Sequence, residues 1–193
     1  MNAKRLLLLG FLAIVLTACS PEKPSFKAID LTGADYAQGF QLKDQFGQQR
    51  TLADFKGQVV VVFFGYTQCP DFCPTTLGEW VQVKQALGEN GKRLQAVFIT
   101  VDPERDTAEA LKDYVAHFDP TFLALIPSLE ELPALAKSFK VYYKKVPGPT
   151  PTSYTMDHQA GTYIYDTEGR LRLYARYGLG PAAMTEDIGK LLN

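Results

Sequence analysis

The stretch from Val59 to Pro74, which reads VVVVFFGYTQCPDFCP, decides the fold of this chain. Its first six residues are apolar without alternation, as in a strand with both faces buried, so they predict a central parallel strand covered by helices. The cysteines that follow, Cys69 and Cys73, are four residues apart. On a helical path this spacing advances about 6 Å and returns both side chains to one face. We therefore expect the functional chemistry of the protein at this loop.

Two chemistries fit this cysteine pair. Thiols at such a separation can close a disulfide or converge on one metal ion. A passive disulfide staple explains the loop less well, because it needs neither the flanking Pro70 and Pro74 nor the intervening Asp71. Peroxiredoxin chemistry is excluded, because its Thr-x-x-Cys motif would need threonine where Tyr66 or Pro70 stands.

The third cysteine, Cys19, belongs to an export signal. Lys4 and Arg5 precede the apolar run 6–16, which at about 1.5 Å per residue is too short to cross a bilayer core of about 30 Å. The small residues that end in Cys19 resemble the lipobox of bacterial lipoproteins, which implies cleavage before Cys19 and its lipidation. We expect a signal peptide over 1–18, a lipid-anchored tether over 19–38 and one domain over 39–193.

The charge of the chain argues against a nucleic-acid partner. Residues 1–18 contain two basic and no acidic residues, so the mature chain is more acidic than the net charge of −1 of the whole chain. It also has no basic block. In an oxidising compartment the two remaining thiols, Cys69 and Cys73, would rest as a disulfide unless a reductant or a metal held them apart.

Hydrophobic patterns on both sides of the loop predict a thioredoxin-like α/β fold, with a central mixed sheet flanked by helices and an extra N-terminal hairpin. Turn residues 44–47 predict that hairpin, and the buried strands 59–64 and 94–101 around a helix over 77–87 form a right-handed βαβ unit. Further along we expect helices over 111–118 and 132–139, a surface loop over 144–153, a hairpin of strands 163–165 and 171–177, and a helix from Pro181.

In this fold the cysteine loop meets the N-terminus of a helix. With Cys73 at or next to the N-cap and Pro74 at the first helical position, unpaired backbone N–H groups favour the Cys73 thiolate over its thiol. A thiolate is both a nucleophile in disulfide exchange and a soft metal ligand.

A histidine discriminates between the two chemistries. His117 fits the last turn of a helix, where it suits the helix dipole. His158 stands just before the strand 163–165, beside the cysteine loop, where ordinary thioredoxins carry a cis-proline. Two thiolates and one imidazole form a soft ligand set that suits copper, whereas a structural zinc site normally has a fourth protein ligand.

At these residues the chain resembles the Sco/SenC family of copper-binding, thioredoxin-like, membrane-anchored proteins. The resemblance covers about residues 40–192 and is carried by FFGYTQCPDFCP at 63–74, VDPERD at 101–106, VYY at 141–143, and Asp157 with His158. It implies one copper ion, Cu(I) or Cu(II), per monomer, bound by Cys69, Cys73 and His158. It also implies a role in assembling the binuclear Cu(A) centre of cytochrome c oxidase subunit II.

The acidic residues near the site have open roles. Asp71 either tunes the site or simply starts the helix, and Asp157 could orient the imidazole of His158 as a neighbour of the ligand. The run 102–106 follows a strand whose end faces the cysteine loop, although capping by Asp106 or Thr107 also explains it.

Three function classes remain open from the sequence. The protein is a copper metallochaperone, a thiol–disulfide oxidoreductase that keeps the oxidase subunit's cysteines reduced, or a copper or redox sensor. The expected partner is subunit II or another periplasmic copper protein. We expect a monomer on the periplasmic side of a bacterial membrane. An oxidase-assembly role favours the inner membrane, although Ser20 after Cys19 is not the aspartate that retains enteric lipoproteins there.

Overall fold

The computed structural model describes residues 24–150 and 153–193. In these residues eight strands form one mixed sheet in the order β1-β10-β9-β4-β5-β6-β2-β3, and β7 and β8 form a separate pair. Cys19 and the expected signal peptide lie outside the described residues. The strands are β1 (Ile29–Asp30), β2 (Gln41–Asp44), β3 (Gln49–Thr51), β4 (Val59–Gly65), β5 (Leu94–Thr100), β6 (Leu123–Ile126), β7 (Tyr143–Pro147), β8 (Tyr154–His158), β9 (Thr162–Tyr165) and β10 (Leu171–Ala175).

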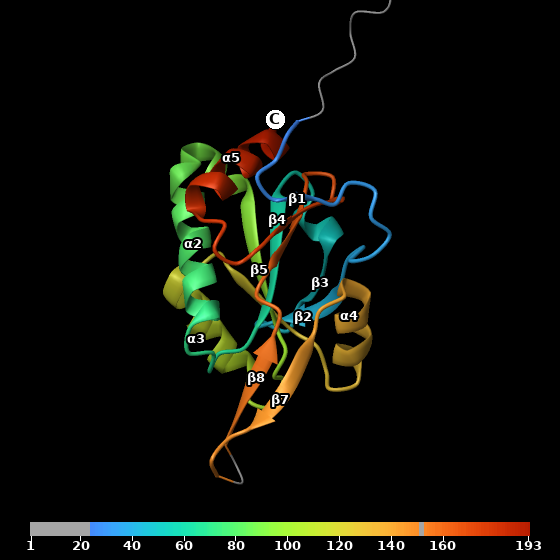
Figure 1. The fold of residues 1–193 in the computed structure, drawn as a ribbon, viewed down its shortest axis with the longest axis vertical. Coiled ribbons are helices and arrows are strands. Elements are labelled where there is room, and N and C mark those ends of the chain that lie inside the picture. The colour runs from blue at the N-terminus through green and yellow to red at the C-terminus, as the bar shows by residue number, and fades with distance from the viewer. Residues whose placement is uncertain (1–23, 151–152) are drawn as a thin grey trace, which may run out of the picture.

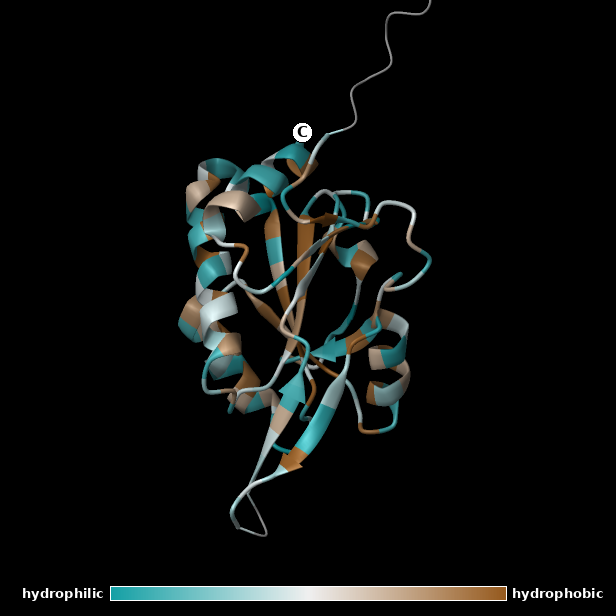
Figure 2. Ribbon diagram, in the orientation of Figure 1, coloured by the Kyte–Doolittle hydropathy of each residue, from teal (hydrophilic) through white to brown (hydrophobic). Residues whose placement is uncertain are grey.

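Helices cover both faces of the central sheet. In Figure 1, α2 and α5 lie on one side of the strands and α4 on the other, and α2 contacts both α3 and α5. Figure 2 shows the hydrophobic residues concentrated on the inner strands. The helices are α2 (Phe72–Ala86), α3 (Ala108–Phe118), α4 (Glu131–Phe139) and α5 (Pro181–Leu192), with short 3-10 helices η2 (Leu52–Phe55) and η3 (Gly88–Arg93).

The expected central strand is β4, and all seven of its residues are buried. It pairs in parallel with β5 and antiparallel with β9. The prediction of a buried central strand is confirmed, but its parallel partner lies on one side only, because β9 reaches the sheet as half of a hairpin with β10. The end of β4 at Gly65 delivers the chain directly into the cysteine loop.

Most predicted elements are confirmed. β4, α2 and β5 form the βαβ unit, and hairpins β2–β3 and β9–β10 form at the predicted turns. The helices α3 and α4 each bury one apolar stripe, and α5 begins at Pro181 as expected. In the described ranges no helix is long and apolar enough to span a bilayer.

Two segments contain strands that the sequence patterns did not predict. The segment predicted as a tether is partly bound to the domain, because β1 pairs with β10 and the backbone N–H groups of Lys27 and Ala28 donate to the buried carboxylate of Asp187. The predicted surface loop 144–153 contains most of β7, which pairs with β8 to form a hairpin projecting from the body at the end opposite α5 (Figure 1). Its prolines hid the strand pattern, although proline is tolerated at the edge of an isolated pair.

Candidate metal centre

The cysteine loop connects β4 to α2 and is held by a buried acid. The carboxylate of Asp106, which is 1% exposed, accepts hydrogen bonds from the backbone N–H of Thr67 at 3.1 Å and its hydroxyl at 2.6 Å. It also accepts the hydroxyl of Thr100 at the end of β5, at 2.6 Å. Asp106 therefore fixes the loop to the edge where β5 ends, while Thr107 caps α3 through the N–H of Ala110.

Cys69 lies in this loop and Cys73 in the first turn of α2. Both are free thiols and buried, with exposed fractions of 7% and 0%. The backbone N–H of Cys73 points at the sulfur of Cys69, with a distance of 3.5 Å from nitrogen to sulfur. The free N–H groups at the start of the helix are therefore directed at Cys69.

This arrangement corrects the predicted ionisation of the pair. α2 begins at Phe72, so Cys73 is its second residue and Pro74 its third, not its first. The Cys73 thiol donates to Cys69 and, with the N–H groups of Asp71 and Cys73, holds the pKa of Cys69 well below its usual range, against the effect of burial. Burial raises the pKa of Cys73, and the neighbouring Cys69 raises it further. Of the two sulfurs, Cys69 is therefore the one at which this arrangement favours a thiolate.

The space for the Cys73 sulfur depends on a glycine. A Cβ atom at Gly65 would lie 2.6 Å from the Cys73 Sγ and 2.7 Å from the ring of Phe98. Such distances are far inside van der Waals contact, so any other residue at the end of β4 would displace the thiol.

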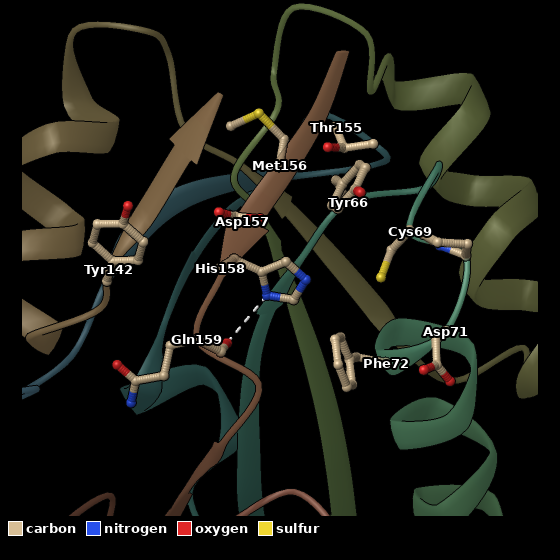
Figure 3. A pocket seen from close by; sticks show the side chains of 11 residues that line it. Tyr66, Cys69, Asp71, Phe72, Tyr142, Thr155, Met156, Asp157, His158 and Gln159 are labelled. Carbon is tan, nitrogen blue, oxygen red and sulfur yellow. Dashed lines mark hydrogen bonds between the residues drawn. The ribbon is translucent and has the colours of Figure 1, made fainter. Parts of the chain in front are cut away.

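His158 ends β8 and turns its ring toward the side of the cavity where Cys69 lies (Figure 3). The ring packs edge-on against Phe63 and Tyr66, with centroids 6.0 and 5.7 Å away. Its Nδ1 lies 3.1 Å from the carbonyl oxygen of Gln159. A carbonyl can only accept, so Nδ1 carries the proton and the Nε2 lone pair is free for a metal.

Together the three side chains form a compact set of soft ligands. The Nε2 of His158 lies 3.5 Å from the Cys73 Sγ, and the three ligand atoms all lie within 4.8 Å of one another. Among the described residues this is the one group of three or more cysteine, histidine and acidic side chains close enough to hold a metal ion. Two sulfurs and one imidazole nitrogen suit copper.

The group borders a cavity of about 510 Å³. Its rim includes the exposed rings of Phe72 and Tyr142, which are 42% and 59% accessible to solvent. Cys69 and His158 line it, whereas Cys73 is buried beneath them. A partner would therefore reach Cys69 and His158 first.

The remaining candidate residues take different places. Asp71 immediately precedes α2, but its side chain makes no capping hydrogen bond, and it acts on Cys69 through its backbone N–H. Asp157 is exposed beside the cavity, and the Gln159 carbonyl orients the imidazole in its place. His117 is exposed in the last turn of α3, as expected.

Sequence reasoning missed the residues that position the ligands. Arg105 and Asp106 belong to VDPERD, whose place at the end of a buried strand was recognised, but their contacts with the cysteine loop were not predicted. Gly65 carried a signal too, since a glycine ending an apolar strand indicates close approach of another atom.

Comparisons with known proteins identify relatives over nearly the whole described chain. The family model described as SCO1/SenC matches residues 30–193. A SCO2-like protein of Rickettsia conorii is 33% identical over 93% of this chain and 89% of its own length. The human mitochondrial SCO2 homolog is 41% identical over 79% of this chain, which spans 58% of that protein.

Solved structures agree with the family model. ScoI of Bradyrhizobium japonicum with copper bound is 40% identical, with a TM-score of 0.72 over 79% of this chain and 97% of that one. Yeast Sco1 with copper bound is 30% identical, with a TM-score of 0.71 over 79% of this chain and 85% of that one. The likeness confirms the expected thioredoxin-like fold. The chain belongs to the SCO1/SenC family.

Proposed function

We propose that this protein is a membrane-anchored copper metallochaperone that carries one copper ion on Cys69, Cys73 and His158. One observation supports this most directly: two sulfurs and one imidazole nitrogen converge within 4.8 Å beside an open cavity. Relatives that are 40% and 30% identical have been solved with copper bound. Copper is the cargo here, and three soft ligands suit Cu(I).

The site prepares its ligands for the metal unequally. The surroundings of Cys69 favour its thiolate, and His158 offers its Nε2 lone pair. The sulfur of Cys73 carries a proton that must leave when the sulfur becomes a ligand. Because Cys69 and His158 border the cavity, a partner's ligands can replace these two before the buried Cys73.

The proposed destination is the Cu(A) centre of cytochrome c oxidase, in subunit II or through another periplasmic copper protein. This rests on the family to which the chain belongs. The proposed anchor is lipid on Cys19, at the periplasmic face of the inner membrane, with the domain as a monomer.

The histidine provides the test. In cells grown at limiting copper, His158→Ala should assemble little active oxidase and recover in part when copper is added, because the nitrogen ligand is lost while the dithiol remains. His117→Ala is the matched control and should respire normally, because its ring is exposed on α3. Normal oxidase activity in His158→Ala cells at limiting copper would overturn the proposal.

A second candidate, a thiol–disulfide oxidoreductase, is favoured by the unequal thiols. The Cys69 thiolate could attack a partner disulfide, and Cys73 would then close the Cys69–Cys73 disulfide. The partner would take up two electrons, one proton from Cys73 and one proton from solvent. Such an enzyme would keep its activity in His158→Ala and lose it in Cys69→Ser and Cys73→Ser. The same set of cells therefore separates the two functions.

A further inference from the structure

The histidine ligand stands on an element that the central sheet does not hold. In the described part of the chain, β7 and β8 hydrogen-bond to each other and to no strand of the eight-stranded sheet. Figure 1 shows this hairpin projecting from the body. The distance from His158 to the two sulfurs is therefore set by the contacts that bind the hairpin to the body.

One side chain contacts the hairpin and the cysteine loop at once. Arg105, in the loop between β5 and α3, donates through Nη1 to the backbone carbonyl of Tyr154 at 2.9 Å and to the side-chain carbonyl of Gln68 at 3.0 Å. Tyr154 begins β8, and Gln68 precedes Cys69 in the cysteine loop. The guanidinium also lies over the Tyr154 ring, with its central carbon 3.5 Å from the ring centroid.

A buried carboxylate holds the guanidinium in place. Asp102, which is 3% exposed, accepts a short hydrogen bond from the Arg105 Nε and another from the Tyr154 hydroxyl at 2.8 Å. Asp102, Arg105 and Tyr154 thus form a closed set of contacts, which we call the clasp. The same guanidinium approaches Tyr66, 5.8 Å from its ring centroid, and Tyr66 packs on His158.

The clasp needs arginine rather than any cation. Its planar group donates in three directions while stacking on an aromatic ring, which the point charge of lysine cannot do. A second ion pair, Glu104 with Lys145, also joins this loop to the hairpin, but both side chains are about half exposed. Exposed pairs of this kind contribute little to stability.

We propose that Arg105 is a positioning residue: it holds the β7–β8 hairpin closed so that His158 meets Cys69 and Cys73. It is not a ligand itself. The inference deepens the proposed function. Its test by copper binding rests on that function, whereas its test by hydrogen exchange of the hairpin needs no metal.

Arg105→Lys tests the clasp, with Glu104→Gln as the matched control because it removes the exposed pair to the same hairpin. In metal-free protein, hydrogen exchange of residues 154–158 should speed up in Arg105→Lys while β4 and β5 stay protected. Tyr154→Phe, which keeps the ring and deletes the hydroxyl, should speed it up less. Glu104→Gln should match the wild type. Unchanged hairpin exchange in Arg105→Lys overturns the inference.

The copper-binding test is a double-mutant cycle that combines Arg105→Lys with His158→Ala. Arg105→Lys should weaken copper affinity about 10- to 100-fold, the usual effect of losing a group that orients a ligand. In the His158→Ala background it should have no further effect, and the nitrogen signature in the electron paramagnetic resonance spectrum of the Cu(II) form should be lost in both single variants.

The outcomes separate the two claims. An equal loss of affinity with and without His158 overturns the clasp as the device that positions the histidine. Equal copper affinity of wild type and His158→Ala overturns the proposed function instead, and the exchange of the hairpin then decides for or against the clasp.

Discussion

Gly65, at the end of β4, is a position of the site where any larger residue would clash with its neighbours. Gly65 leaves room for the Cys73 sulfur and the Phe98 ring on the buried strand β4. We expect Gly65→Ala to lower the free energy of unfolding by about 1–3 kcal/mol, because neither neighbour can retreat from a packed core. The displaced thiol should also weaken copper binding. Denaturant unfolding and copper titration check both effects.

Gly78→Ala is the control for this substitution. Gly78 lies in α2, and its added Cβ would meet nothing within 4 Å. Alanine there should stabilise the protein by about 0.5–1 kcal/mol, since alanine favours a helix interior over glycine. Unaltered stability and copper affinity in Gly65→Ala would contradict the claim that Gly65 leaves the space for the Cys73 sulfur.

At the same scale, the residue types of the site were predictable and their ionisation was not. Cys69, Cys73 and His158 follow from chemistry and spacing. Which sulfur is the thiolate depends on where α2 begins, and the helix starts earlier than its apolar pattern indicates. A shift of two residues moves the free N–H groups from one cysteine to the other.

At the scale of elements, periodicity located the long strands and helices and missed the β7–β8 hairpin. An isolated pair lies on the surface, so its side chains do not alternate as those of a half-buried strand do. The proline-rich stretch 147–151 of the sequence is also typical of a loop. Hydrophobic periodicity depends on burial, so it could not predict the hairpin that carries the third ligand, His158.

The β9–β10 hairpin supplies a test of stability against pH. Asp166, with its side chain 4% exposed, accepts the N–H groups of Glu168 and Arg170 and pairs with the side chains of Arg170 and Arg172. Burial alone would raise the pKa of Asp166, but these contacts outweigh it and lower the pKa. A lowered pKa in the folded state stabilises the protein above the unfolded-state pKa of about 3.9.

We therefore expect Asp166→Asn to cost about 1–3 kcal/mol at neutral pH. The difference from wild type should shrink as the pH falls below about 4, because wild-type Asp166 is then protonated through its lowered folded pKa. Glu168→Gln, on the exposed side of the turn, is the control. Denaturant unfolding at several pH values measures both, and a difference that grew toward low pH would contradict this sign.

At the scale of the whole molecule, the order of helices and strands along the chain was enough to predict the fold. This works because the apolar face of each element packs against a neighbouring element. The extent of the domain was harder to predict. The short strand β1 and the N–H groups of Lys27 and Ala28 are bound by β10 and Asp187, more than 140 residues away in the chain. A local sequence pattern cannot predict a contact between residues so far apart in the chain. Residues 27–30, which belong to the segment predicted as a tether, therefore contact the domain predicted to begin at residue 39.

The central claim is that Cys69, Cys73 and His158 together bind one copper ion. Two measurements together test it most directly. They are the copper X-ray absorption spectrum of the reduced, copper-loaded protein and the copper content of each variant. We expect one copper per chain with two sulfur ligands and one imidazole nitrogen. Cys69→Ser or Cys73→Ser should abolish binding, and His158→Ala should lose the nitrogen. A full complement of copper in either cysteine variant, or an unchanged nitrogen signal in His158→Ala, would contradict it.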